Sequence, residues 1–407
     1  MAPNSLRETT GAPSGAAAPD LRGLRVLTTC EFLPWRSCGG SDIVAWQVAR
    51  RLVRWNAEVA LVTGRPHGEQ GVLEEEIEGV RVIGVPTVEL SRRLGVELTV
   101  PRGIWPELRR AAAELAPTVV HAHSLHFPSS VAAAAFARRA RLPLVLTAHI
   151  GGLDRLPLAV RAATAMYERT VGRLLLARAR EVVAVSDAVA AHVRRRAPEG
   201  VVVSVAPNGV DCAEFAPDGA ARATDVPPHV VFVGRLIANK GADLVAEALA
   251  ALGRSGEQFT ASFVGDGPLR DRLERRVADL GLSGRIAFTG AVRDVAARLR
   301  RADVLVRPSL TEGLPLAVLE AMASGTCVIA SDIPGNADLI EHGVSGLLVP
   351  PGSLARLTDA IGGAVRSTEL RRRLAEGGAR VAARHSWDET ARVTSAALAR
   401  AASPAVR

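Results

Sequence analysis

Two cationic side chains in the second half of the sequence are suited to bind an anion. Arg235 and Lys240 belong to the segment GRLIANKG, which follows an apolar run and precedes a segment with helical periodicity. An arginine offers a planar fork and a lysine a compact point charge, a combination used to bind phosphates. Lys240 is the only lysine among 50 basic residues. Its presence in a chain that otherwise uses arginine favours a function over the alternative, an incidental charge in a surface loop.

A glutamate in an apolar helix needs hydrogen-bond donors. The segment EGLPLAVLEAMASG predicts a helix at positions 316 to 323, preceded by Pro315 and closed by Gly325. Every position of this helix except Glu320 is apolar, so we expect it to be buried nearly all round. Burying an ionised, unpartnered carboxylate would cost several kcal/mol. The donors are either two vicinal hydroxyls, such as those of a ribose, or an arginine of the chain, and the spacing leaves both open.

The start of the same helix offers backbone donors. Glu312 comes just before it, close to the N–H groups of Leu316 and Ala317. First-turn N–H groups have no acceptor within a helix, so these two could hold a diphosphate.

Paired glycines and a histidine mark two further segments. SCGGSDIVAWQVARRL places Gly39 and Gly40 before an amphipathic helix, for which Ser41 is the predicted N-cap. Adjacent glycines let a backbone approach a ligand closely, although most such pairs form only a turn. TAHIGG places His149 at the end of a strand. There it either hydrogen-bonds a ligand or has a structural role.

The sequence predicts no metal site. His121 and His123 share one face of a strand, without a carboxylate at fitting spacing. The four cysteines are scattered, with no CxxC pair, and we expect them to be reduced thiols in an intracellular protein.

The elements that must position these residues form a βαβ pattern. Short β-branched runs alternate with longer Ala/Leu/Arg segments of helical periodicity. Thirteen strands are expected, at 24–30, 58–64, 80–86, 119–124, 144–149, 181–186, 201–209, 230–236, 261–267, 286–292, 304–309, 327–331 and 346–350. Residues 216–229 resemble a linker. The pattern predicts two doubly wound α/β domains facing each other across a cleft, with the functional residues at the carboxyl ends of the strands.

Length and composition set the broad class. A chain of 407 residues exceeds one ordinary core, so two domains are expected. The net charge of +8 invites a nucleic-acid or membrane partner. Its basic residues are spread along helix faces and aromatic residues make up only 3% of the chain, which favours solvated surfaces over a nucleic-acid site. No apolar run has membrane-spanning length and the first 20 residues lack a secretion signal, so we expect a cytoplasmic protein with a disordered tail.

The ordered series of motifs resembles the retaining glycosyltransferases of the GT-B fold, family four (glycosyltransferase group 1). The series comprises the Gly-Gly pair, TAHI, VVAVSDAV, PNGVD, GRLIANKG, FVGDGP, FTGAV, RPSLTEGLPLAVLEAMASG and PGNADLIEHGVSGLLVPPG. It spans nearly the whole folded chain. The resemblance implies two Rossmann-like domains: an acceptor-side domain at 21–210, a nucleotide-sugar domain at 211–385, and a C-terminal helix at 386–407 that crosses back to the first domain.

The resemblance also implies roles for the residues singled out above. Glu320 would bind the ribose hydroxyls and Glu312 would lie against the donor sugar. Arg235 and Lys240 would neutralise the diphosphate, and the backbone at Val292 would meet the base.

Residues of the first domain complete the implied site. Gly39 and Gly40 would close on the diphosphate and the acceptor, and His149 would contact the sugar or the acceptor hydroxyl. The remaining predicted donor-binding residues are Gly234, Gly313, Leu314, Leu316 and Ala317.

Two departures from the family pattern are visible. Pro315 stands where many relatives have glycine, and it removes one backbone donor. Arg307 stands where an apolar residue is more usual. Neither change removes a predicted catalytic group.

The implied activity is transfer of a sugar from a UDP- or GDP-linked donor to an acceptor hydroxyl, with retention of configuration and no required cofactor. A nucleotide-sugar epimerase of the same fold and a non-catalytic partner subunit of a transferase are the alternatives. The acceptor class is open among sugars, inositol phosphates, lipids and secondary metabolites. No nucleic-acid partner is expected, and the basic N-terminal domain would suit a peripheral contact with an anionic membrane at its inner face.

Overall fold

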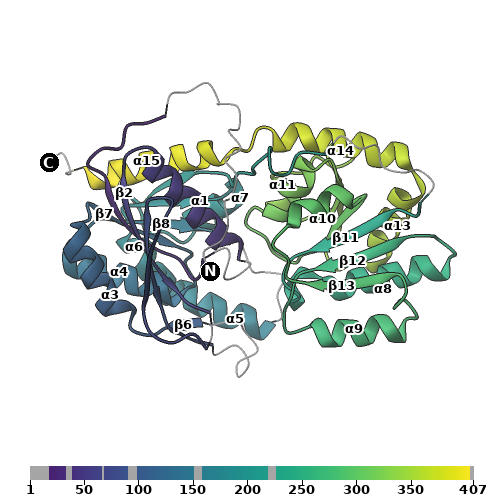
Figure 1. The fold of residues 1–407 in the computed structure, drawn as a ribbon, viewed down its shortest axis with the longest axis horizontal. Helices are drawn as coiled ribbons and strands as arrows, with labels where there is room; N and C mark the ends of the chain where they lie inside the picture. Colours follow the sequence, from purple (N-terminus) through teal and green to yellow (C-terminus); the bar gives the residue numbers. More distant parts are fainter. Residues whose placement is uncertain are drawn as a thin grey trace. The chain divides into compact units, whose positions relative to one another are not determined.

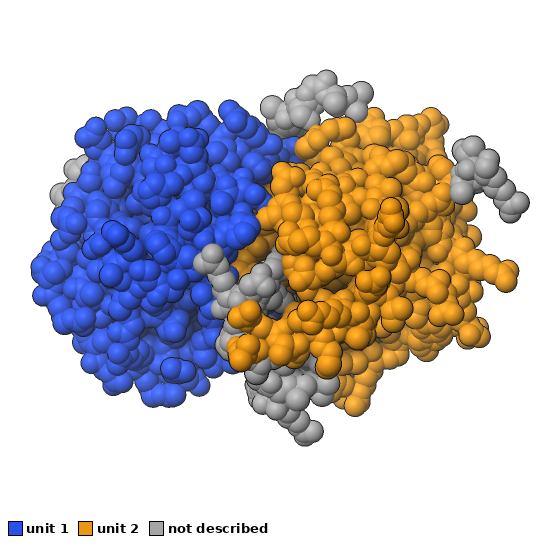
Figure 2. All heavy atoms as spheres, turned by 180° about the vertical axis from the view of Figure 1, so that it is seen from behind, with its two compact units in different colours: residues 1–17, 209–310, 316–386 blue, residues 18–208, 311–315, 387–407 orange. Residues whose placement is uncertain are grey.

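The protein divides into two compact units, which Figure 2 shows in different colours. The structure is a computed structural model that describes residues 18–33, 39–66, 68–89, 99–150, 158–218 and 226–403. Unit 1 contains residues 209–310 and 316–386, and unit 2 contains residues 18–208, 311–315 and 387–407. Most of the predicted N-terminal tail lies outside the described residues.

Unit 1 is built on a parallel sheet of six strands in the order β13-β12-β11-β14-β15-β16 (Figure 1). Its strands are β11 (His229–Val233), β12 (Thr260–Val264), β13 (Ile286–Gly290), β14 (Val304–Arg307), β15 (Cys327–Ser331) and β16 (Leu347–Val349). When the six strands are numbered 1 to 6 along the chain from β11, they lie in the sheet in the order 3-2-1-4-5-6, which is typical of a doubly wound nucleotide-binding fold.

Helices cover both faces of the unit 1 sheet (Figure 1). On one face α8 packs against α9 and α13, and on the other α11 packs against α10 and α14. Their bounds are α8 (Ala242–Arg254), α9 (Arg270–Asp279), α10 (Val295–Arg301), α11 (Leu316–Ala323), α13 (Leu354–Arg366) and α14 (Thr368–Ala382); the short η2 (Ala238–Lys240) and α12 (Pro334–Ala337) precede α8 and follow β15. The strands read as continuous apolar runs because both faces are buried.

Unit 2 is built on a sheet of eight strands in the order β10-β9-β8-β7-β1-β2-β4-β3. Its strands are β1 (Arg25–Thr29), β2 (Glu58–Gly64), β3 (Leu73–Ile77), β4 (Val80–Val85), β7 (Val119–His123), β8 (Leu144–Ala148), β9 (Glu181–Ala184) and β10 (Val202–Val205). All pairs are parallel except β3 with β4. A separate antiparallel pair joins β5 (Thr87–Glu89) to β6 (Thr99–Pro101).

The helices of unit 2 come from both ends of the chain (Figure 1). They are α1 (Gly40–Arg54), α3 (Ile104–Leu115), α4 (Pro128–Ala140), α5 (Leu158–Tyr167), the π-helical turn η1 (Glu168–Gly172), α6 (Arg173–Arg178), α7 (Asp187–Arg194) and the C-terminal α15 (Trp387–Ala402). Helix α15 packs on α1, where Arg51 pairs with Asp388 at 2.6 Å. Its far end is joined to β9 by Arg400 and Glu181, also at 2.6 Å.

The thirteen predicted strands are all present, most of them one to several residues shorter than predicted. Three strands were not predicted. Strand β3 has the acidic sequence LEEEI and alternates in exposure at the sheet edge, and β5 and β6 have three residues each. The predicted N-cap Ser41 is wrong: Gly39 is the N-cap of α1, and no side chain caps this helix.

Two further expectations concern cysteines and membranes. Within the described residues Cys30, Cys212 and Cys327 form no disulfide, and Cys38 lies outside them. Among the helices of the described part of the chain, none combines the length and apolar character required to cross a membrane.

Candidate functional site

The strand order of unit 1 identifies where a ligand binds this unit. Successive crossovers leave β11 and β14 in opposite directions, and open parallel sheets bind ligands beyond the carboxyl ends of such a strand pair. Gly234 and Arg235 follow β11, while Arg307 is the last residue of β14 and Pro308 comes after it. The predicted cationic segment therefore begins at this switch point.

Arg307 is a buried cation at the switch point. Its side chain passes against Gly234, which has φ +145 and no room for a Cβ because the Arg307 guanidinium occupies that position. The guanidinium donates a hydrogen bond to the Val233 carbonyl and lies 5.7 Å from the centre of the Phe232 ring. Only glycine at position 234 lets the two strand ends approach in this way. Arg307 had no predicted role, although an arginine in an otherwise apolar strand was the available signal.

The two predicted phosphate-binding cations follow β11 in one short segment. Arg235 is exposed directly after the strand, and Lys240 is half-buried in the turn η2. Gly241, with φ +71, is the N-cap of α8 and packs so closely on Pro308 that a Cβ would lie 2.6 Å from the Pro308 carbonyl oxygen. This packing fixes the Lys240 turn beside the end of β14, so Arg235, Lys240 and Arg307 lie at the same edge of the sheet.

Helix α11 has one accessible strip, and Glu320 lies on it. Six of its eight residues are buried, as predicted, whereas Ala317 and Glu320, three residues apart, are partly accessible. Within the described residues, the Glu320 carboxylate has no hydrogen-bond or ion-pair partner. The alternative of a salt bridge to an internal arginine is therefore not observed in this part of the chain.

Burial raises the pKa of Glu320 to about 7, and the charge of Glu214 adds to this shift while the Arg307 cation opposes it. The opposing effect of Arg307 connects the helix to the cations of the switch point. A carboxylate held near its titration point, without a donor from the described residues, can gain stability by accepting hydrogen bonds from a ligand.

The segment between β14 and α11 is held by unit 2. Ser186 Oγ donates to the Gly313 carbonyl at 3.0 Å, and Asn208 Nδ2 donates to the Leu314 carbonyl at 2.8 Å. Gly313 packs directly on the His149 carbonyl, which leaves no space for a side chain at position 313. These contacts fix the backbone directly after the half-buried Glu312. Ser186 and Asn208 belong to the motifs VVAVSDAV and PNGVD, which had no predicted role.

The switch point of unit 2 lies between β1 and β7, and histidines follow the strands there. His123 ends β7 and is 1% exposed, while His149 follows β8 and is half-buried. His123 Nδ1 and His149 Nε2 are 3.1 Å apart, and His121 Nε2 lies 2.8 Å from Thr147 Oγ1. The His121 and His123 rings share one face of the strand, 4.2 Å apart, as predicted.

All three imidazoles are neutral at neutral pH. Burial lowers the pKa of His121 and of His149 to about 3, with a smaller contribution to His121 from the His149 charge, and it lowers the pKa of His123 well below its usual value. Such an imidazole is too weak a base to remove a proton from an alcohol, but it can donate or accept a hydrogen bond. His123 Nε2 is buried without a hydrogen-bond partner in the described residues.

The glycine pair lies at the start of α1, which follows β1 in unit 2. Gly39 is half-buried and Gly40 is exposed. A Cβ on Gly39 would lie 2.5 Å from Asp42 Oδ2. Asp42 is buried in the first turn, and its Oδ1 accepts a hydrogen bond from the Phe32 N–H at 3.2 Å. Glycine at position 39 is thus needed for this carboxylate to fold back on the helix start.

The remaining predicted residues lie in unit 1. Val292 is half-buried two residues after β13, at the same carboxyl edge as Gly234. Leu316 and Ala317 form the first turn of α11. The structure therefore distributes the predicted site residues over both units. Within the described residues, no group of three or more His, Cys, Asp or Glu side chains is arranged to hold a metal ion.

Comparison with protein families assigns the chain. The family model described as Glycosyl transferases group 1 matches residues 220–381, and the model described as Glycosyltransferase Family 4 matches residues 38–214. Together they match most of the chain. The chain belongs to the family 4, group 1 glycosyltransferases.

Relatives of this glycosyltransferase are similar over the whole chain or over part of it. The D-inositol 3-phosphate glycosyltransferase of Salinispora arenicola is 28% identical over 390 residues, covering 86% of this chain and 85% of the relative. The alpha-D-kanosaminyltransferase of Streptomyces kanamyceticus is 35% identical over 157 residues, 38% of this chain and 41% of that protein. The GDP-mannose-dependent alpha-(1-6)-phosphatidylinositol monomannoside mannosyltransferase of Mycobacterium tuberculosis is 34% identical over 171 residues, 38% of this chain and 44% of that protein.

Solved structures confirm the fold class of this glycosyltransferase. Sucrose-phosphate synthase from Thermosynechococcus elongatus superposes with a TM-score of 0.77 at 24% identity, covering 93% of this chain and 98% of that one. The predicted GT-B class, with two Rossmann-like domains, is therefore correct.

Proposed function

We propose that this glycosyltransferase transfers a sugar from a nucleoside-diphosphate sugar, UDP- or GDP-linked, to an acceptor hydroxyl with retention of configuration. The observation that carries the proposal is Glu320. It is a carboxyl group with a raised pKa on the accessible strip of α11. The charge of Arg307 at the unit 1 switch point acts on it, and it has no ion pair in the described chain.

The donor is proposed to bind at the carboxyl edge of unit 1. Arg235, Lys240 and the first-turn N–H groups of α11 hold the diphosphate, because positive charge and free backbone donors both favour an anion there. Glu320 accepts the two ribose hydroxyl hydrogen bonds. Arg307 keeps the local potential positive from beneath, through its buried position against Gly234. The GDP-mannose dependence in the name of the mycobacterial relative supports a nucleotide-linked donor.

Catalysis is proposed to rest on stabilising the leaving diphosphate. The bond between the anomeric carbon and the diphosphate oxygen breaks, and the acceptor oxygen forms its bond on the same face. The leaving phosphate oxygen takes the acceptor's proton. Negative charge grows on the diphosphate during this step, and fixed cations lower its energy without reorganisation. No metal or other cofactor is assigned a role.

The unit 2 residues are proposed to contact the sugar and the acceptor. His149 hydrogen-bonds as a neutral imidazole, Glu312 lies against the donor sugar, and Gly39 and Gly40 bring the start of α1 close to the diphosphate and acceptor. The acceptor named for the Salinispora relative, inositol 3-phosphate, makes a phosphorylated cyclitol the first candidate acceptor to test.

A donor panel tests this proposal. UDP, GDP and ADP are each added to the protein, and the melting temperature should rise with one of them by mass action. The sugar nucleotide carrying that base is then incubated with a panel of sugars, inositol phosphates and lipids, and nucleoside diphosphate release and product configuration are followed. Acceptor-dependent release with an α-linked product from an α-linked donor is expected. Isomerised free sugar would identify the epimerase alternative, and binding without turnover across the panel would identify the non-catalytic one.

A further inference from the structure

A continuous helical segment of unit 2 exposes apolar and basic side chains on one side. The segment runs from α5 through the turn η1 into α6. Residues 162, 166, 170, 174 and 178 are all exposed, and residues four apart lie nearly in line on a helix. This line includes Met166 and Leu174, which are 68% and 67% exposed. Two large apolar side chains are thus presented to solvent on one line of a helix.

Arginines accompany these apolar residues. Arg161, Arg169 and Arg173 are exposed beside the line, and Arg178 ends it. Within the described residues, none of these four has an ion-pair partner. Between residues 158 and 180 the single acidic residue is Glu168, which is buried and pairs with Arg196 at 2.7 Å. The exposed side of the segment, called here the α5–α6 face, therefore carries positive charge only.

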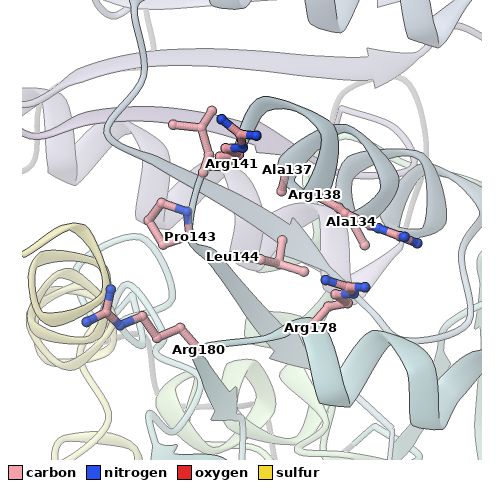
Figure 3. Close-up of a pocket in the computed structure, with 9 residues that line it drawn as sticks. Ala134, Ala137, Arg138, Arg141, Pro143, Leu144, Arg178 and Arg180 are labelled. Carbon is pink, nitrogen blue, oxygen red and sulfur yellow. The ribbon is translucent and has the colours of Figure 1, made fainter. Parts of the chain in front are cut away.

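The α5–α6 face ends at a pocket of about 390 Å³ that is lined by arginines (Figure 3). The lining includes Arg138 at the end of α4, Arg141 just after it, Arg178 at the end of α6 and Arg180 before β9. Figure 3 shows the Arg138 and Arg178 side chains to the right of Leu144 and Arg180 to its left. No acidic residue is among those that line it. The pocket can therefore accommodate an anionic group.

Helix C-termini offset only part of the positive charge of the pocket. Helices α4 and α6 both end at the pocket, and a helix C-terminus carries roughly half a negative charge. Two such ends offset about one of the four guanidinium groups. Arg180 Nη1 also donates a hydrogen bond to the Ala401 carbonyl at 3.2 Å. The pocket retains a positive excess after these interactions are counted.

Several arginines elsewhere in unit 2 are neutralised by ion pairs within the protein. Arg110 pairs with Glu107 and Glu74, each at 2.7 Å, and Arg81 pairs with Glu74 at 2.5 Å and also with Glu114. The surface around β3 and α3 thus balances its own charges. The contrast shows that the unbalanced charge of the α5–α6 face is local and is not a property shared by every arginine of the unit.

We propose that the α5–α6 face and its arginine pocket dock unit 2 on the headgroup layer of an anionic lipid bilayer. Met166 and Leu174 enter the interface, and the arginines bind headgroup phosphates, because apolar and basic side chains on one exposed helix face suit this boundary. A nucleic acid would use the charge but not the apolar line, and the face presents no exposed aromatic platform for bases.

The arginine pocket lies away from the candidate site of unit 2. The pocket lies at the amino ends of β8 and β9, whereas His149 follows the carboxyl end of β8. A strand of five residues spans about 16 Å. The arginine pocket is therefore separate from the histidine edge, and the inference does not depend on the proposed function.

Vesicle binding by the full chain tests the proposal. The wild-type protein should bind vesicles of phosphatidylglycerol and phosphatidylcholine at low salt, bind pure phosphatidylcholine vesicles far more weakly, and lose most of its binding in 1 M salt. The triple variant Arg169→Gln, Arg173→Gln, Arg178→Gln should bind anionic vesicles about 100-fold more weakly, since each basic residue near such a surface contributes about a fivefold effect.

A matched control separates this face from net charge. Arg272, Arg275 and Arg373 are exposed arginines of unit 1, and replacing all three by glutamine removes the same charge. This control should bind vesicles within about threefold of the wild-type affinity. Met166→Gln with Leu174→Gln should also weaken binding while leaving the charge unchanged. Equal losses in the two arginine triples, or no loss in the apolar double variant, would refute the proposal.

A single substitution tests the pocket without harming the fold. Arg141 has φ 56, a left-handed conformation that glycine adopts more readily. Arg141→Gly should therefore keep or raise the melting temperature while weakening binding to anionic vesicles severalfold. Unchanged vesicle binding would remove the pocket from the proposal. Tighter binding of the wild-type protein to a duplex DNA oligonucleotide than to anionic vesicles would overturn the lipid assignment.

Discussion

The carboxyl edges of the two sheets differ in the charge of the side chains they carry. The unit 1 edge gathers permanent charges, namely Arg235, Lys240 and Arg307, with Glu320 held near its titration point. The unit 2 edge gathers imidazoles that burial keeps neutral. A charged edge suits a diphosphate, and a neutral hydrogen-bonding edge suits hydroxyl groups. In the proposed function, the same doubly wound framework would let one unit bind the ionic half of a sugar nucleotide and the other bind the sugar and the acceptor.

Removing a cation from the charged edge should have the largest effect. Lys240→Ala should lower kcat by about 10²- to 10³-fold, as does loss of one preorganised group that stabilises a developing anion. Circular dichroism and the melting temperature should stay near the wild-type values, because Lys240 is half-buried in a turn. Lys240→Arg restores the charge and should recover part of the rate. Wild-type turnover in Lys240→Ala would mean that the diphosphate is held elsewhere.

Changing the neutral edge should have a smaller effect with a distinct pH signature. His149→Ala should lower kcat/KM by about 10- to 100-fold through loss of one hydrogen bond in a buried site. Because the pKa of His149 is about 3, its titration should not appear near pH 6.5 in the pH–rate profile. The profiles of wild type and variant should therefore have the same shape around that pH. A limb near pH 6.5 that disappears in the variant would show that His149 titrates during turnover and would contradict its neutral role.

The same histidines should make the fold sensitive to acid. Their folded pKa values lie below the unfolded value near 6.5, so the unfolded chain binds more protons as the pH falls. The free energy of unfolding should therefore have its highest value above pH 6.5 and decrease steadily towards pH 4. Denaturant titrations of wild type and His121→Phe should diverge in this range, with the variant losing less stability. Parallel curves would contradict the buried neutral state.

Glu320→Gln should separate stability from binding on the charged edge. The folded pKa of about 7 exceeds the unfolded value, so ionisation of Glu320 lowers the free energy of unfolding. This destabilisation is absent below pH 4.5 and is fully developed above pH 7. The variant should be more stable than the wild type by roughly 1 to 3 kcal/mol at pH 8 and equal to it at pH 4.5. Thermal unfolding at both pH values measures this difference. Lower stability at pH 8 would mean that the carboxylate is satisfied by the protein itself.

Loosening the Gly313 turn should have the smallest effect. Ser186 caps α7 through the Val189 N–H at 3.2 Å and also donates to the Gly313 carbonyl. Ser186→Ala should cost about 1 to 2 kcal/mol of stability and raise the KM for the donor severalfold. Ser186→Thr keeps the hydroxyl and serves as the control. An unchanged KM in Ser186→Ala would show that this turn does not position Glu312.

Much of the framework could be predicted because its signals are local. Apolar runs that end in small or polar residues gave the thirteen strands, and the apolar segment after Pro315 gave α11 with its observed bounds. Strand β3 was not predicted, because three consecutive glutamates hide the alternation of an edge strand. Ser41 was taken for the N-cap because its type is typical of that position, whereas the backbone places Gly39 there.

The candidate site was less accessible from sequence because it depends on long-range packing. Arg307 could be seen as an unusual residue in its strand, but its contact with Gly234 joins two strands some seventy residues apart in the chain. Ser186 and Asn208 act through hydrogen bonds to backbone more than 100 residues away. Spacing cannot predict such contacts. The loops at 31–38, after β1, and at 150–160, after β8, fall partly outside the described residues.

Proton-linked binding of the nucleotide tests the central claim most directly. Calorimetric titration at pH 7 with whichever of UDP, GDP or ADP binds, repeated in buffers of different ionisation enthalpy, measures the protons released. Ribose hydroxyls on an ionised Glu320 should lower its pKa from about 7. The account predicts release of about half a proton in the wild type, and none together with weaker binding in Glu320→Gln. Equal affinity and equal proton release in the two proteins would contradict it.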